Sequence, residues 1–123
     1  MTNALIVMAG GAIGSLFRFG LNNFFDPIQS KFPFATLFAN AISSFLLGYF
    51  IGMAELNRIE YSRLLFLSTG FCGGFSTFST FSSENVKLMQ SGHAFLALIY
   101  ILISVLIGCL MVYLGWKLTK IVY

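Results

Sequence analysis

The stretch from Gly70 to Ser82 combines glycines, phenylalanines and hydroxyl side chains inside a segment that is otherwise apolar. Glycine disfavours the helix interior, and serine and threonine compete for backbone hydrogen bonds, so a continuous helix is a poor fit. Within a membrane, irregular backbone persists only where protein or a watery cavity satisfies its polar groups. Hydroxyls and free peptide groups at that depth are what an ion path requires. The stretch therefore predicts a broken transmembrane helix that lines an ion site.

A break between Gly73 and Ser79 would give two half-helices whose facing ends differ in polarity. The first would end in free carbonyls, which favour a cation, and the second would begin with free amides, which favour an anion. Because no acidic residue lies in the break, a cation there would be held by carbonyl oxygens. An anion could use the Asn40 amide, the hydroxyls and the ring edges of Phe78 and Phe81. A hydroxyl-rich packing seam between helices is the alternative interpretation.

Three further polar residues lie in or beside apolar stretches. Asn40 must face protein or water, either as a hydrogen bond between helices or as a donor to an anion. Arg18 either reaches the lipid headgroups or stands at the mouth of an anion path. Glu84 is three residues from Lys87, so a structural pair between them is one explanation, and the role of Glu84 stays open.

The composition indicates an integral membrane protein of one domain, residues 1–123. Hydrophobic residues make up 58% of the chain and charged residues only 9%, against about 25% charged in soluble proteins. A chain of 123 residues is too short to hide that much apolar surface from water. The net charge of +3 comes from scattered lysines and arginines, which does not indicate a nucleic-acid partner.

The chain lacks the residue patterns of an enzyme or a zinc site. Its single histidine, His93, follows Gly92 in an expected turn, so no nucleophile–base pair can be formed with it. Cys72 and Cys109 lie in apolar segments and are interpreted as small buried hydrophobic residues. We therefore expect neither catalysis nor a disulfide framework.

Four apolar stretches predict an all-α fold of four transmembrane helices. Crossing the hydrocarbon core takes about 20 helical residues, and the stretches run over about residues 4–21, 34–54, 63–90 and 94–116. Asp26-Pro27 and Ser91-Gly92 are turn signals between them. In the fourth stretch Tyr100, Ser104 and Gly108 are four residues apart and share one helix face, which could pack or line a path.

The basic residues give only a weak preference for one orientation in the membrane. Four spans place both termini on one side, together with Arg58, Arg63, Lys117 and Lys120. The other side has Lys31 and Lys87, with Arg18 near it. Four against two or three is a small excess for the rule that fixes orientation, so the chain is expected to insert both ways round.

Three blocks of this sequence together resemble a known family. The run from Gly73 to Ser82 followed by Glu84 resembles the signature of the small bacterial fluoride channels, the Fluc or CrcB family. Residues 10–14 with Arg18, and residues 36–40, resemble the other two blocks of that family. The resemblance covers all four predicted spans in order.

The resemblance implies an assembly and an ion site that the residues alone do not. Members of the family are antiparallel, dual-topology homodimers with two fluoride pores and a buried structural sodium ion. The carbonyls that hold the sodium correspond to Gly73 and Ser76 of each subunit. The residues that correspond to the fluoride pore are Asn40, Phe78, Phe81, Ser79, Thr80, Tyr100, Ser104 and Arg18. Gly108 stands where some members have a pore-lining serine, which leaves a hydroxyl at that point in question.

The expected function is passive, selective export of fluoride across the bacterial cytoplasmic (inner) membrane, which would protect the cell against fluoride toxicity. One alternative is a proton-coupled exporter of the small multidrug-resistance type. That mechanism needs a membrane-buried carboxylate in the first span, where the only charged residue is Arg18. A structural membrane subunit that transports nothing is the third interpretation.

Overall fold

Every regular element in the computed structural model, which describes residues 1–25 and 30–123, is helical. Four helical segments are long and apolar enough to cross a membrane: Thr2–Phe25, Phe34–Glu55, Tyr61–Gln90 and Ala94–Val122. The expected all-α membrane fold with four spans is confirmed. The turn expected at Asp26-Pro27 lies outside the described residues.

The third span is composite, whereas the other three are single helices. These three are α1 (Thr2–Phe25), α2 (Phe34–Glu55) and α6 (Ala94–Val122). The third span consists of α3 (Tyr61–Leu64), the π-helical segment η2 (Leu65–Cys72), α4 (Gly73–Phe75) and α5 (Phe78–Gln90). Between α4 and α5 the backbone is extended, with φ −73° and ψ 159° at Ser76 and φ −154° and ψ 121° at Thr77. The predicted break in the third helix is therefore confirmed and is two residues long.

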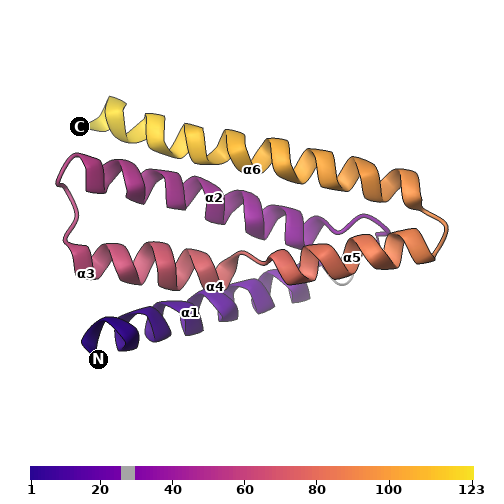
Figure 1. Ribbon diagram of the computed structural model, residues 1–123, viewed down its shortest axis with the longest axis horizontal. Helices are drawn as coiled ribbons and strands as arrows, with labels where there is room; N and C mark the ends of the chain where they lie inside the picture. The colour runs from indigo at the N-terminus through magenta and orange to yellow at the C-terminus, as the bar shows by residue number, and fades with distance from the viewer. Residues whose placement is uncertain (26–29) are drawn as a thin grey trace.

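The four spans lie roughly side by side, with the third span and α2 in the middle of the view (Figure 1). α6 follows α2 along its length, and α1 packs against η2 and α4, the first half of the broken span. Both termini lie at the same end of the molecule as the α2–α3 connection (Figure 1), as expected for four spans. The break thus lies near mid-length, between α1 on one side and α2 on the other.

Glycines let these helices approach until backbones touch. A Cβ atom on Gly14 of α1 would collide with the carbonyl of Phe71 in η2. A Cβ atom on Gly48 of α2 would likewise collide with the carbonyl of Val112 in α6. Small residues at helix contacts are the usual basis of association in lipid, where burial of apolar surface gives little driving force. The first contact holds α1 against the broken span, and the second holds α6 against α2.

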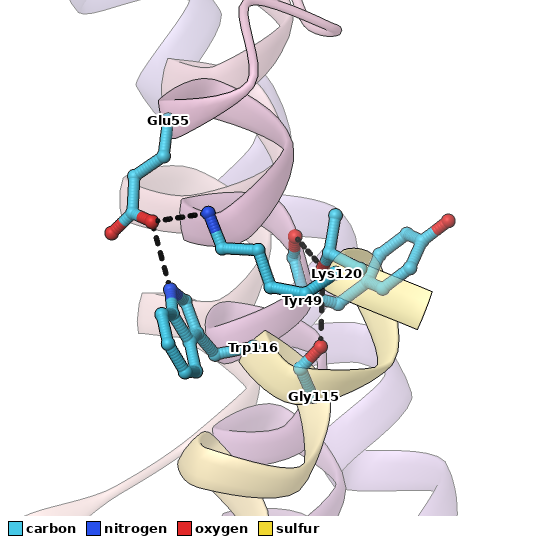
Figure 2. A network of polar contacts seen from close by, with 6 residues as sticks. Tyr49, Glu55, Gly115, Trp116 and Lys120 are labelled. Carbon is cyan, nitrogen blue, oxygen red and sulfur yellow. Dashed lines mark hydrogen bonds and ion pairs between the residues drawn. The ribbon is translucent and has the colours of Figure 1, made fainter. Parts of the chain in front are cut away.

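α6 continues past Trp116 to Val122, beyond the apolar stretch that the sequence predicts as a span. At this end Glu55, the last residue of α2, accepts hydrogen bonds from Trp116 Nε1 at 2.8 Å and Lys120 Nζ at 2.9 Å (Figure 2). Lys120 Nζ also lies 5.3 Å from the centre of the Trp116 ring. The aromatic and basic end of the chain therefore joins α6 to α2 at the membrane boundary.

Candidate functional site

The break begins at the Cys72 carbonyl, which accepts three hydrogen bonds. The donors are Ser76 N at 2.9 Å, Ser76 Oγ at 2.9 Å and Ser43 Oγ of α2 at 2.8 Å. One residue later the pattern changes. In a continuous helix the Thr77 N–H would donate to the Gly73 carbonyl, four residues before it. It donates to a side chain of α2 instead, which frees the Gly73 carbonyl from that helical bond.

The α2 side chain that takes the Thr77 N–H is Asn40. Its Oδ1 accepts from Thr77 N at 2.8 Å, and its Nδ2 donates to Thr77 O at 3.3 Å. Thr77 in turn caps α5, because its Oγ1 accepts from Thr80 N at 3.2 Å. A side-chain amide carries two N–H donors, so one remains beyond the bond to Thr77. Asn40 therefore links two helices and still has a donor for a ligand, so the two roles considered for it are compatible.

Three aromatic rings follow the break in a row. Phe78 is the first residue of α5 and is 79% exposed on the single chain. Its ring centre lies 5.8 Å from that of Phe81, which in turn lies 5.1 Å from the ring of Tyr100 on α6. Phe81 is half-buried, and Tyr100 is fully buried. The row reaches from the outer surface at the break to the interior between α5 and α6.

Hydroxyl groups accompany the aromatic row at its α5 end. Thr77 Oγ1 lies 3.1 Å from Thr80 Oγ1 and 3.4 Å from Ser79 Oγ. Ser79 is exposed and Thr80 is half-buried. These three hydroxyls stand together at the start of α5, where an anion also meets the positive end of the helix dipole.

Of the two positions on α6 where the sequence led us to consider a serine hydroxyl, only Ser104 has one. Ser104 Oγ is buried and has no hydrogen-bond partner in the part of the chain that the structure describes. At Gly108 a Cβ atom would lie 3.8 Å from Ser44 Oγ of α2. The Ser44 hydroxyl therefore stands close to the point where the family resemblance led us to look for a serine on α6.

Glu84 lies beside Tyr100, the last ring of the aromatic row, and its carboxylate accepts two hydrogen bonds. Thr36 Oγ1 donates to its Oε1 at 2.7 Å, and the Tyr100 hydroxyl donates to its Oε2 at 2.8 Å. Both donors are almost completely buried. The ion pairs found in the described residues do not include Glu84 with Lys87, the pair that the sequence left as one explanation. Thr36 and Asn40 are four residues apart and therefore lie on the same face of α2. This spacing was the signal in the sequence that Thr36, like Asn40, would contact the third span.

Arg18 of α1 reaches the break from the opposite side. Its Nη1 lies 3.5 Å from the Ser76 carbonyl oxygen, and the side chain is half-buried. A carbonyl oxygen has two lone pairs, so it can still contact a second cation, at a cost from repulsion by the guanidinium. Of the two carbonyls predicted to bind sodium, that of Gly73 is therefore less affected by the Arg18 guanidinium.

A recess of about 390 Å³ opens beside these carbonyls, on the side of the break that faces α2. Its lining is rich in hydroxyls: Ser43, Ser44, Leu47, Ser68, Thr69, Cys72, Gly73 and Ser76. Residues 1–25 and 30–123 contain no cluster of three or more His, Cys, Asp or Glu side chains that could hold a metal. Oxygen ligands from the backbone and from hydroxyls suit a hard cation.

Comparison with known proteins gives matches along the whole chain. The profile of a family described as "CrcB-like protein, Camphor Resistance (CrcB)" matches residues 5–116. A protein of Pyrococcus furiosus named "Fluoride-specific ion channel FluC" is 43% identical over 94% of both chains. Proteins of the same name from Pyrococcus abyssi and from a strain of Thermus thermophilus are 37% and 40% identical. These alignments cover 98% of both chains for the first, and 93% of this chain and 91% of the relative for the second.

Proposed function

The chain belongs to the CrcB family, as its motifs predict, and we propose that it is a fluoride-specific ion channel that exports fluoride passively. The relatives are named as channels, and the four apolar helices make the protein a multi-pass membrane protein. The observation that carries the proposal is the meeting of Asn40, Phe78 and Phe81 at the break, in a chain so similar to those relatives. Fluoride would move down its electrochemical gradient.

The site addresses the main physical obstacle, which is the removal of water from a small anion. An ion in a medium of low dielectric constant is very costly unless other groups replace its hydration shell. The free N–H of Asn40, the hydroxyls at the start of α5 and the electropositive ring edges of Phe78 and Phe81 are replacements of this kind. Because these groups bear no net charge, they stabilise the ion without trapping it, as conduction requires.

We propose that the functional unit is an antiparallel homodimer with two pores. A single chain leaves the hydroxyl-lined recess open and the Phe78 ring exposed. This surface would face lipid, where unpaired backbone groups and hydroxyls are unfavourable. A second copy would cover them. The weak asymmetry of basic residues between the two ends supports insertion in both orientations. The resulting dimer would have two pores that run in opposite directions.

We also propose that a structural sodium ion binds between the two copies, held by the Gly73 and Ser76 carbonyls of each. The freed Gly73 carbonyl, the surrounding hydroxyls and the lack of an acidic side chain in the break support main-chain ligation. Such an ion would supply a positive charge that links the two broken helices. The cytoplasmic (inner) membrane is the location that fluoride export requires, since fluoride would leave the cytoplasm there.

Fluoride release from liposomes tests the proposed function. Purified protein should release fluoride much faster than chloride when potassium efflux through an ionophore carries the balancing charge. Replacing Phe78 or Phe81 by isoleucine should lower the fluoride rate while the assembled protein keeps its size on gel filtration. Phe95 on α6, 75% exposed against 79% for Phe78, is the matched control, and Phe95→Ile should leave the rate unchanged. An unchanged rate in the Phe78 and Phe81 variants would refute the role of the ring edges.

The same assay separates the alternatives. A proton-coupled drug exporter would need an acidic residue in α1, and Arg18 is the only charged residue there. A structural subunit without transport would release neither ion.

A further inference from the structure

A cavity of about 660 Å³ opens at the end of the molecule away from the termini, and the proposed pore does not account for it. We propose that this basic cavity collects anions for the pore through Lys31, Lys87 and His93, and that protonation of His93 strengthens the collection. The inference rests on the proposed function and adds an entrance site and its regulation. The lining residues of the basic cavity that carry the argument are Lys31, Glu84, Lys87, Ser91 and His93.

The charge of the basic cavity favours an anion. Lys31 lies in the segment before α2, Lys87 in α5 and His93 in the turn before α6. Within the described part of the chain, Glu84 is the only acidic side chain in the lining, and hydroxyls from two neighbouring helices already bond to both its oxygens. Among the described residues, two lysines therefore face a single carboxylate, and this carboxylate bonds to Tyr100 at the buried end of the aromatic row.

The hydrogen bonds of His93 fit one tautomer of the neutral ring. Lys31 Nζ lies 3.1 Å from His93 Nε2, and an ammonium group can only donate, so Nε2 must accept. The ring proton is then on Nδ1, which donates to Ser91 Oγ at 3.1 Å. The Ser91 hydroxyl donates onward to the Leu88 carbonyl, also at 3.1 Å. The chain of hydrogen bonds is complete only when the imidazole is neutral.

Protonation of His93 would break this chain at its first bond. An imidazolium carries hydrogen on both nitrogens, so Nε2 and the Lys31 ammonium would then be two donors and two like charges in contact. Among residues 1–25 and 30–123, the charged groups that face His93 are Lys31 from the segment before α2, and Glu84 and Lys87 from α5. The described end of α1 and the first turn of α6 present none. Lys31 would be released into the cavity, and the cavity would gain one positive charge.

The expected effect on flux follows from Coulomb's law. One added unit charge about 6 Å from an anion in water raises its local concentration about threefold. Histidine changes its charge between about pH 5 and 8. Single-channel fluoride current at low ionic strength should therefore rise about threefold as the pH falls from 8 to 6. Salt should reduce the rise, because the Debye length falls to about 8 Å at 0.15 M.

Because the chain has a single histidine, its imidazole can be observed directly. Protein with ¹⁵N-labelled histidine, reconstituted in lipid, should show the neutral Nδ1–H tautomer at high pH. Sodium fluoride should raise the midpoint pH of His93 by about half a unit, the equivalent of a threefold change. Sodium gluconate at the same ionic strength is the control. A midpoint that fluoride leaves unchanged would overturn the proposal, whatever the flux.

Three variants complete the test. H93Q should remove the pH dependence of the current, and K31Q should lower the current at every pH. K117Q removes the same charge from a residue outside the cavity lining and should leave the pH dependence of the current intact. A pH dependence that survives in H93Q would overturn the inference. Wild-type protein that conducts no fluoride would instead refute the proposed function, so the two failures are distinguishable.

Discussion

Replacing Asn40 by alanine tests whether this amide organises the broken helix. The change removes the hydrogen bonds of 2.8 Å and 3.3 Å to the two peptide groups of Thr77. Thr77 is only 7% exposed, so its N–H and carbonyl would have no water to replace the lost partner. An unsatisfied buried polar group costs about 1–3 kcal/mol, whereas side-chain hydrogen bonds between helices in membranes average only about 0.6 kcal/mol. Because the partners of Asn40 are backbone groups, we expect Asn40→Ala to lower the free energy of unfolding by about 2 kcal/mol, in the higher of these two ranges.

Asn85 on α5 provides a matched control for this variant. It is also a buried asparagine in a span, 4% exposed, but its Nδ2 donates only to the Phe81 carbonyl of its own helix at 2.8 Å. Its Oδ1 has no partner in the described residues, so alanine there removes a buried acceptor that was already unsatisfied. Asn85→Ala should therefore change stability by less than about 1 kcal/mol.

Unfolding by SDS in mixed micelles, followed by circular dichroism, measures both variants. Asn40→Ala should unfold at a clearly lower SDS concentration than Asn85→Ala, and hydrogen exchange at the Thr77 amide should become faster. Fluoride release should fall in the same variant, since Phe78 begins the helix that Thr77 caps. Equal stability of the two variants, with Thr77 exchange unchanged, would refute the reasoning.

Two further predictions concern helix packing and the hydrogen bonds of the Glu84 carboxylate. Gly48→Ala should destabilise the protein by at least about 2 kcal/mol, because the added Cβ would meet an α6 carbonyl. Gly20→Ala is the control and should be harmless, since its Cβ would have nothing within 4 Å. SDS unfolding compares the two variants, and similar midpoints would contradict the close contact. Tyr100→Phe should lower the free energy of unfolding by about 1–3 kcal/mol, because it removes the hydrogen bond to Glu84. The control is Tyr113→Phe at an exposed position, which should change it by nothing measurable. Thermal unfolding in detergent measures both, and equal changes would contradict the role of the Glu84 bond.

The break in the third span was predictable because its cause is local. Gly73 and Gly74 weaken the helix, and the hydroxyls of Ser76 and Thr77 offer the backbone other partners. Both effects act over a few residues, so the sequence contains the information. The structure adds that the break is confined to Ser76 and Thr77, and that the helix before it is π-helical in part.

The partners of the break were not predictable, because they depend on how distant helices pack. Asn40 and Thr77 are 37 residues apart, and their pairing requires α2 and the third span to lie in one register. Glu84 and Thr36 are 48 residues apart. Spacing along a single helix suggested Lys87 for Glu84, since only neighbours on the same helix can be identified in this way.

The carbonyls that the family resemblance implies for sodium, and the pore residues on α5 and α6, remain predictions of ion contact. The structure places Gly73 and Ser76 beside a hydroxyl-lined recess, with Arg18 close to the second carbonyl. Exchange of sodium for a larger monovalent cation during purification should lower the thermal stability of the proposed dimer. No change in stability across cations would contradict a structural sodium ion.

A reversal potential measures directly whether the pore of this chain selects fluoride over chloride. Purified protein in a planar bilayer would separate sodium fluoride on one side from sodium chloride at equal concentration on the other. The account predicts a reversal potential far from zero, with the sign that fluoride permeation sets. A reversal potential near zero, which equal permeability to both anions would produce, would contradict it.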